Sequence, residues 1–369
     1  MTFSTFSLDQ RINSGIKACG YETPTPIQDQ AIPLILEGHD VMGLAQTGTG
    51  KTAAFALPIL QRLLESKKAT QAIPRVLVLA PTRELALQIN QNFRDLGKQT
   101  PVRSDVVIGG VGMNPQIRAF STCQVIVACP GRLVRLMSKG AVNLHHIDTL
   151  VLDEADRMLD MGFMPDIKRI LAKLPAKRQN LLFSATMPAD IRKLANTILV
   201  NPKTVQVANT VAVASVGHAF YTTQNHLKIG LLGKLLDTTD HQSVLIFTRT
   251  KHKAKNLSRK LSNDGYNCTF LQGNMSQSQR QKALDGFRQG KFTIMVATDI
   301  AARGIDCDCI SHVINFDMPD TVETYTHRIG RTGRAGRGGE AVSLVTHEDK
   351  TQVQSIERVM RIKLQHRSL

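Results

Sequence analysis

Residues 41–60 read VMGLAQTGTGKTAAFALPIL, and this stretch decides the fold of the first half of the chain. An apolar run from Val41 to Leu44 leads into a glycine-rich turn, and a helical pattern follows from Ala53 to Leu64. Backbone N–H groups at a helix N-terminus can surround an anion. Strand, glycine turn and helix in that order therefore predict a phosphate-binding loop.

Each residue of this loop has an expected task. Lys51 neutralises the β- and γ-phosphates of a nucleotide, and the Thr52 hydroxyl takes a position on Mg²⁺. Ala45 stands where the general pattern has glycine, so a simple glycine-rich turn is the alternative. The residues expected to bind the nucleotide here are Thr47, Gly48, Thr49, Gly50, Lys51 and Thr52.

An acidic motif, DEAD at residues 153–156, follows the apolar run Leu150 to Leu152. At the end of a strand, Asp153 is placed to bind Mg²⁺ and Glu154 to orient an attacking water. Four such residues also suit an acidic helix N-terminus. The phosphate loop upstream favours the catalytic interpretation.

Three arginines and two glycines form the segment HRIGRTGR at residues 327–334. One interpretation is an arginine finger that contacts a γ-phosphate, formed by Arg328, Arg331 or Arg334. The other, equally compatible with the sequence, is a basic surface that binds the phosphate backbone of a nucleic acid. The residues alone leave both interpretations open.

Short apolar runs recur along the chain, each followed by a turn and a longer amphipathic stretch. This alternation predicts βαβ units around parallel sheets buried on both faces, an α/β fold. A short basic helix is expected from Ile356 to Leu364. Beyond Val41–Leu44, the predicted strands are Val76–Ala80, Val106–Gly109, Val125–Ala128, Leu150–Asp153, Leu181–Ser184, Val244–Thr248, Cys268–Gln272, Phe292–Thr298, Val313–Asp317 and Ala341–Val345.

The alternation stops at residues 208–217, which read ANTVAVASVG and are small and uncharged. We interpret this segment as a flexible linker between domains 1–207 and 218–369. An edge strand of the first domain is the alternative.

Charge and composition limit the class of protein. The 369 residues carry a formal charge of +16, and the excess is shared equally by the halves on either side of residue 205. A polyanionic partner that touches both halves would explain this, although solubility alone would too. No apolar run approaches the ~20 residues that a membrane helix needs, so no membrane is expected. The N-terminus lacks the pattern of a secretory signal, and six scattered cysteines favour reduced thiols and a cytoplasmic location.

Taken together, the motifs resemble those of the DEAD-box ATP-dependent RNA helicases of superfamily 2 over nearly the whole chain. The N-terminal motif comprises Phe3, Gly20, Tyr21, Pro24 to Ile27 and Gln28. Further matches are AQTGTGKT (45–52), PTRELA (81–86), GG (109–110), CPGR (129–132), DEAD (153–156), SAT (184–186), LIFTRT (245–250), Gln277 with Arg280, ATDIAARGID (297–306) and HRIGRTGR (327–334). The resemblance implies two tandem RecA-like domains, each with a mainly parallel sheet flanked by helices.

The resemblance also assigns roles within the nucleotide site. Tyr21 and Gln28 would hold adenine, and Asp306 the ribose of ATP. Asp156, Ser184 and Thr186 would couple hydrolysis to strand separation. The residues implied to act in catalysis are Lys51, Asp153, Glu154, Arg331 and Arg334, with Thr52 and Asp153 on Mg²⁺.

RNA is the implied partner, held with little sequence preference through sugar and phosphate contacts. Closure of the two domains on ATP and RNA would bring Arg331 and Arg334 to the γ-phosphate and melt a short duplex locally. Ribosome-assembly or RNA-decay proteins are further candidate partners. The implied RNA contacts are Pro81, Thr82, Arg83, Gly109, Gly110 and Arg132 in the first half, and Arg249, Arg280, Thr298 and Gly304 in the second.

Two positions depart from the family pattern, and the short ends resemble the bacterial RhlE-type branch. Cys129 stands where the family usually has threonine, which removes a good hydroxyl donor to RNA. Gln272 stands where many members have histidine. Three other functions are alternatives: a DNA helicase or translocase of the same superfamily, a clamp that binds ATP and RNA without turnover, and a phosphoryl-transfer kinase. The N-terminal motif disfavours the first, intact Lys51 and Glu154 the second, and the lack of an acceptor pocket the third.

Overall fold

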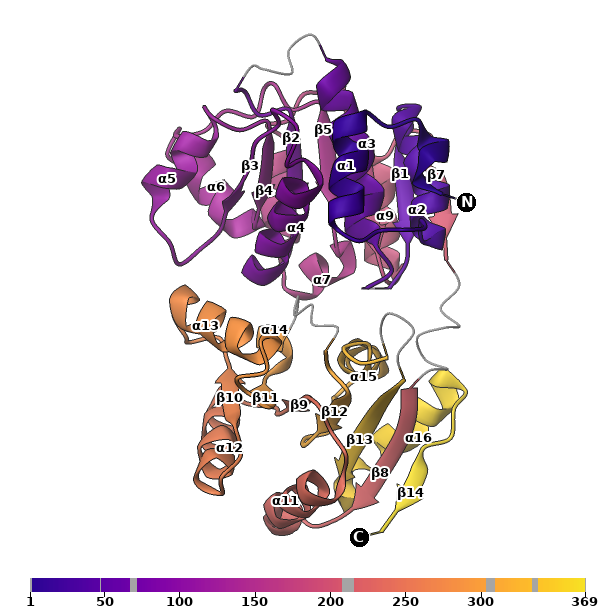
Figure 1. Ribbon diagram of the computed structural model, residues 1–369, viewed down its shortest axis with the longest axis vertical. Helices are drawn as coiled ribbons and strands as arrows, with labels where there is room; N and C mark the ends of the chain where they lie inside the picture. The colour runs from indigo at the N-terminus through magenta and orange to yellow at the C-terminus, as the bar shows by residue number, and fades with distance from the viewer. Residues whose placement is uncertain are drawn as a thin grey trace. The chain divides into compact units, whose positions relative to one another are not determined.

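The computed structural model describes residues 2–46, 48–66, 72–207, 216–302, 309–333 and 338–368. The chain divides into two compact units, Met1–Ala208 and Asn209–Leu369. Each unit contains a seven-stranded sheet with helices packed on its faces (Figure 1).

In the first unit the strand order is β3-β4-β2-β5-β6-β1-β7, and every pairing is parallel. Parallel neighbours place the carboxyl ends of all these strands at one edge of the sheet. The strands are β1 (Val41–Leu44), β2 (Val76–Leu79), β3 (Ser104–Val107), β4 (Val125–Ala128), β5 (Thr149–Leu152), β6 (Gln179–Ser184) and β7 (Lys203–Gln206).

Alternating side chains of these strands enter two cores, one on each face of the sheet. In β2, for example, Val76 and Val78 join one core and Leu77 and Leu79 the other. Helices α1 to α4 cover the first core and α5 to α9 the second. The helices are α1 (Gln10–Ala18), α2 (Pro26–Leu36), α3 (Lys51–Glu65), α4 (Arg83–Leu96), α5 (Met113–Ala119), α6 (Pro130–Ser138), α7 (Ala155–Asp160), α8 (Met164–Leu171) and α9 (Ala189–Ile198), after a 3₁₀ turn at Phe3–Phe6.

The second unit repeats this design, with strand order β10-β11-β9-β12-β13-β8-β14 and parallel pairing throughout. Its strands are β8 (Val216–Thr222), β9 (Val244–Phe247), β10 (Cys268–Leu271), β11 (Ile294–Ala297), β12 (His312–Asn315), β13 (Gly339–Val345) and β14 (Gln365–Arg367). Its helices are α11 (Lys228–Thr238), α12 (Lys251–Asn263), α13 (Gln277–Arg288), α14 (Asp299–Ala302), α15 (Val322–Ile329) and α16 (Lys350–Met360), with 3₁₀ turns at Asn225–Leu227 and His347–Asp349.

All predicted strands are present, with ends that differ by up to two residues at either end. Three strands were missed: β7, β8 and β14 lie toward one side of their sheets and carry several exposed or polar residues, which weakens the apolar signal. Most of the expected linker, residues 208–215, lies outside the described ranges. Val216 and Gly217, which we expected in the linker, instead begin β8 and pair with β13.

The C-terminal helix predicted from Ile356 to Leu364 overlaps α16 only from Ile356 to Met360. Helix α16 ends at Met360, because Arg361 adopts a left-handed conformation at φ 54°, and β14 follows. Among the cysteines, Cys19, Cys123, Cys129 and Cys268 are free thiols, whereas Cys309 is disulfide-bonded, against our expectation. Across the described ranges, every helix is too short or too polar to span a bilayer.

Candidate active site

Three neighbouring strands of the first sheet end in the predicted nucleotide residues. The order β5-β6-β1 places the DEAD motif, Ser184 and the glycine loop side by side at the carboxyl edge. Ligands of open α/β sheets bind at this edge. The topology thus brings together motifs that are far apart in the sequence.

The glycine loop joins β1 to α3 in the expected order. Gly48 and Gly50 have φ angles of 86° and 90°, a region that favours glycine. The ammonium of Lys51 is buried and donates to the carbonyl of Ala45 at 2.8 Å, which folds this side chain back over the loop. Thr49 closes the loop by donating to the Gln46 carbonyl at 2.7 Å.

Gln28 links the N-terminal motif to this loop. Its buried amide oxygen accepts from the Thr25 backbone N–H at 2.9 Å, forming the capping box of α2. Its amide nitrogen donates to the Gly50 carbonyl at 3.1 Å. A Cβ on residue 50 would lie 2.4 Å from that nitrogen, so glycine permits the contact.

Tyr21 was the aromatic residue expected to stack on adenine. Its ring is half-buried and stacks against Phe3, with centroids 6.4 Å apart and planes inclined by 23°. Phe3 itself is buried in the core under α1 and α2. The two aromatic residues of the N-terminal motif therefore form one platform.

The acidic motif begins directly after β5. Asp153 is buried, and burial raises the pKa of its carboxyl to about 6 despite the opposing effect of Lys51. One carboxylate oxygen of Asp153 accepts from the Glu154 backbone N–H at 2.9 Å. A buried carboxylate near the lysine of a phosphate loop is suited to bind a cation that also contacts an anionic substrate.

Glu154 adopts a left-handed backbone conformation at φ 51°, which non-glycine residues rarely take outside functional sites. Its carboxylate accepts a hydrogen bond from Arg157 Nη1 at 2.8 Å. The exposed fractions of the two side chains are 4% and 3%. This ion pair between Glu154 and Arg157 was not predicted from the sequence.

The three predicted coupling residues contact one another. Asp156 Oδ2 accepts from the Thr186 hydroxyl at 3.0 Å and from the Thr186 backbone N–H at 2.9 Å. The Ser184 hydroxyl accepts from the Asp156 backbone N–H at 3.3 Å and donates to the Thr186 carbonyl at 2.8 Å. The DEAD motif is therefore hydrogen-bonded directly to the end of β6 and to the residues that follow it.

Strands β2, β4 and β3 also end at this edge, on the other half of the sheet, and carry the predicted RNA residues of the first unit. Pro81 and Thr82 follow β2, and Thr82 caps α4 by accepting from the Leu85 N–H at 3.2 Å. Arg83 lies against the glycine pair after β3. A Cβ on Gly110 would lie 2.3 Å from Arg83 Nη1.

Helix α6 follows β4 and carries Arg132. Burial lowers the pKa of Arg132, and the nearby charges of Arg135 and Arg83 act in the same direction. Because these positive charges repel one another, binding of an anion beside Arg132 would be favourable. Cys129 occupies the N-cap of α6 without a side-chain cap bond, and burial raises its thiol pKa to about 12.

In the second unit, Arg249 follows β9, and its guanidinium pairs with Asp320 at 3.3 Å. Thr298 directly follows β11, and its carbonyl accepts from the N–H groups of Ala301 and Ala302. Arg280 is buried, with its guanidinium donating to the carbonyls of Gln272 and Ala301 at 3.1 and 3.3 Å. Arg280 thus joins α14 to the residue that follows β10, in addition to its predicted RNA role.

The arginine segment begins at the end of α15. Arg328 forms a two-point ion pair with Asp299 at 2.6 and 2.8 Å and lies over the Phe247 ring, so it holds the unit together. Arg331 is buried and donates to the His327 carbonyl at 3.2 Å. Four predicted site residues lie outside the described ranges: Thr47, Gly304, Asp306 and Arg334.

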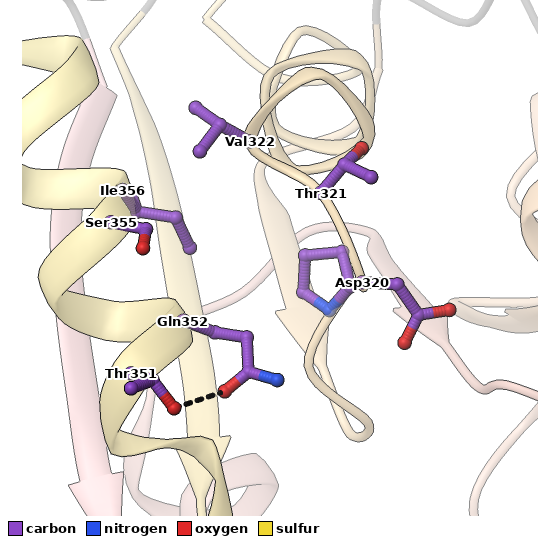
Figure 2. A pocket seen from close by; sticks show the side chains of 8 residues that line it. Asp320, Thr321, Val322, Thr351, Gln352, Ser355 and Ile356 are labelled. Carbon is purple, nitrogen blue, oxygen red and sulfur yellow. Dashed lines mark hydrogen bonds between the residues drawn. The ribbon is translucent and has the colours of Figure 1, made fainter.

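A pocket of about 360 Å³ lies in the second unit between the start of α15 and α16 (Figure 2). Asp320, Thr321 and Thr351 are among the lining residues. Because no predicted ATP or RNA residue lines it, the pocket lies outside the candidate site.

Two family models match this chain. The model described as DEAD/DEAH box helicase matches residues 25–194, and the model described as helicase conserved C-terminal domain matches residues 227–336. The two matches fall in the first and second units respectively.

Curated relatives match almost the entire chain. ATP-dependent RNA helicase CshA of Limosilactobacillus reuteri is 41% identical over 366 residues, covering 99% of this chain and 73% of the relative. This chain belongs to the DEAD-box ATP-dependent RNA helicases. DEAD-box ATP-dependent RNA helicase CshA of Geobacillus kaustophilus is 42% identical over 366 residues, covering 99% of this helicase and 78% of the relative.

Solved structures agree with this assignment. Saccharomyces cerevisiae Dbp5 bound to RNA and ADP BeF3 matches the helicase with a TM-score of 0.88 and 33% identity, covering 99% of this chain and 95% of that chain. A DEAD box protein from Methanococcus jannaschii matches with a TM-score of 0.57 and 34% identity, covering 100% and 99%. The predicted pair of RecA-like domains is confirmed.

Sequence reasoning overlooked Arg157 in this helicase. Its signal was its position: three residues after Glu154, it falls on the same face of a helix that begins at a strand end. The contact of Gln28 with Gly50 had no such signal, because the two residues belong to separate elements that meet only in the folded unit.

Proposed function

We propose that this RNA helicase binds and hydrolyses ATP at the carboxyl edge of the first sheet, with Glu154 orienting the attacking water. The observation that carries this assignment is the buried Glu154 carboxylate, held by Arg157 directly beside Asp153. Lys51 lies close enough to lower the pKa of Asp153 and is placed to meet the phosphates. Gln28 contacts the same loop at Gly50, and adenine would lie against Gln28 and Tyr21.

Mg²⁺ fits this donor set. Asp153 would supply a carboxylate oxygen directly after β5, and Thr52, the second residue of α3, a hydroxyl beside the glycine loop. When bound, Mg²⁺ would neutralise charge that develops on the phosphate oxygens. Lys51 would give up its bond to the Ala45 carbonyl in favour of a phosphate oxygen, since a charged acceptor is the stronger one.

Coupling between hydrolysis and RNA is proposed to run through Asp156. Its carboxylate is bonded to both the main chain and the side chain of Thr186, so a change at Glu154 reaches the end of β6 within one short network. Ser184 closes the network from the other side.

RNA is proposed to contact Arg83 and Arg132 at the sheet edge of the first unit. In the second unit it would contact Arg249 and Thr298. The first domain is taken as residues 1–207 and the second, which begins with β8, as residues 216–369, with residues 208–215 joining them. We propose that both close on ATP and RNA, with Arg331 and Arg334 then contacting the γ-phosphate. The cytoplasmic location and the ribosome-assembly or RNA-decay partners remain predictions.

The RhlE-type branch also remains a prediction. The relatives reported above carry the name CshA and give it no support. We infer no change of function from Gln272, whereas Cys129 lacks the hydroxyl that would donate to an RNA phosphate.

The experiment that tests the proposed function is the stimulation of ATP hydrolysis by different nucleic acids. Steady-state hydrolysis is measured with no nucleic acid, with single-stranded RNA, and with DNA of the same sequence. We expect strong stimulation by RNA and little by DNA, because contacts at the 2′-hydroxyl separate the two. Equal stimulation by DNA would instead indicate a translocase of the same superfamily.

A further inference from the structure

Helix α12 of the second unit carries an unusual charge pattern. Its thirteen residues, KHKAKNLSRKLSN, contain five lysines or arginines and a histidine but no acidic side chain. The helix packs beside β10 and β11 (Figure 1). None of its residues was assigned to the ATP site or the RNA path.

The apolar side of α12 is fixed in the core. Ala254, Leu257 and Leu261 are buried with strand residues of the second sheet. The opposite side therefore faces outward, with Lys251, His252, Arg259 and Lys260 exposed and Lys255 half-buried. This face is rigidly presented rather than carried on a loop.

The placement of the charges is unfavourable for an isolated helix. Lys251, Lys255 and Arg259 follow one another at a spacing of four residues, where like charges repel. The first turn contains no acidic residue although the helix N-terminus favours anions. Both effects would be relieved by an anion lying along this face.

Neighbouring basic residues are neutralised within the unit, which makes the contrast clear. Lys253 pairs with the nearly buried Asp317 at 2.5 Å, and Arg249 pairs with Asp320 at 3.3 Å. Across the described ranges, Lys251, Lys255, Arg259 and Lys260 have no such acidic partner. Among the described residues, the four basic side chains on the outward face of α12 are therefore not neutralised by ion pairs.

We propose that the outward face of α12, formed by Lys251, Lys255, Arg259 and Lys260, is an additional binding surface for the RNA phosphate backbone. Thr250 caps the helix, and the predicted RNA contact Arg249 directly precedes that cap. A strand that meets Arg249 can therefore continue along α12. The helix is about 20 Å long, enough to meet several successive phosphates. This surface lengthens the bound RNA without adding sequence preference.

The test removes three charges from α12 in the full chain, as Lys251→Gln, Lys255→Gln and Arg259→Gln together. Binding of a long, labelled single-stranded RNA is measured by fluorescence anisotropy over a range of salt. Each lost phosphate contact lowers the salt slope by about 0.7 for a single strand. We therefore expect weaker binding and a slope smaller by about 2.

A matched control removes three charges elsewhere on the same unit: Arg358→Gln, Arg361→Gln and Lys363→Gln. All three side chains are exposed near the end of α16. The control should keep the slope of the unmodified protein. Equal losses in both triple variants would mean that net charge alone acts, and an unchanged slope in the α12 variant would mean a merely solvated face. Either result overturns the proposal.

Stability provides a second readout. The α12 variant should unfold at a temperature no lower than the unmodified protein, because it relieves repulsion along the helix. If the triple variant fails to fold, Arg259→Gln alone tests the proposal. The single variant should lower the slope by about 0.7, and an unchanged slope would reject the surface.

Discussion

Arg157 Nη1 donates a 2.8 Å hydrogen bond to Glu154 Oε2, and both side chains are buried at the start of α7. This bond holds one oxygen of the carboxylate that is proposed to orient water. A buried charge pair is costly to break from one side, by about 3–5 kcal/mol. A conservative change is therefore the informative one.

Arg157→Lys should keep the charge but lose the planar fork that orients Glu154. We expect ATP binding to persist while kcat falls by up to about 10²-fold, the effect of a misplacement near 1 Å. The measurement is RNA-stimulated hydrolysis over a range of ATP concentrations. Arg169→Lys is the matched control, because Arg169 forms an exposed pair with Asp166 at the same spacing. Equal kcat in both variants would reject the positioning role.

Gly110→Ala should weaken RNA binding through Arg83. Residue 110 has a φ of 80°, and the added Cβ would lie 2.3 Å from Arg83 Nη1, so the guanidinium must move. We expect a loss of about 1.5 kcal/mol or more in RNA affinity, the value of a charged hydrogen bond. Anisotropy with labelled RNA measures this loss.

Gly140→Ala separates that effect from backbone strain. Gly140 also has a positive φ, 64°, but nothing lies within 4 Å of its added Cβ. Both variants should lose about 1–2 kcal/mol of stability for the left-handed conformation. RNA binding that falls equally in both would show that Arg83 is not involved.

Gln28→Ala should reduce the preference for ATP over GTP. A bidentate amide contact to adenine is worth about 1–3 kcal/mol of discrimination, so the preference should fall by about tenfold. The change also removes the bond to the Gly50 carbonyl, so ATP binding should weaken as well. Binding of both nucleotides is compared with that to Gln30→Ala, an exposed neighbour on α2. An unmodified protein that hydrolyses ATP and GTP equally would exclude the adenine role.

Cys129→Thr should stabilise the first unit. Cys129 has the extended backbone of an N-cap but makes no cap bond, whereas threonine accepts well from the first turn. We expect a gain of about 1 kcal/mol in the free energy of unfolding by urea. Cys129→Ala, which also lacks a cap, should give no gain. A gain in the free energy of unfolding of Cys129→Ala would show that removal of the thiol, and not capping, is stabilising.

The order of local motifs predicted most of the fold, because strand, turn and helix are encoded within short segments such as Val41 to Leu64. The side strands β7, β8 and β14 escaped prediction, since exposed or polar residues interrupt their apolar pattern. The meeting of Asp156 with Thr186 was expected only through the family resemblance. The Gln28 bond to Gly50 and the use of Arg280 as a brace depend on packing between distant segments, which no local pattern records.

The turnover of Glu154→Gln shows whether the Glu154 carboxylate orients the water that attacks ATP. The amide keeps the shape of the buried side chain but loses the carboxylate that orients water, so ATP and RNA should still bind. Glu65→Gln, an exposed position at the end of α3, is the control with the same chemical change. At saturating RNA, ATP hydrolysis by Glu154→Gln should fall by at least about 10²-fold, whereas that of the control should not change. Near-normal hydrolysis by Glu154→Gln would contradict the account.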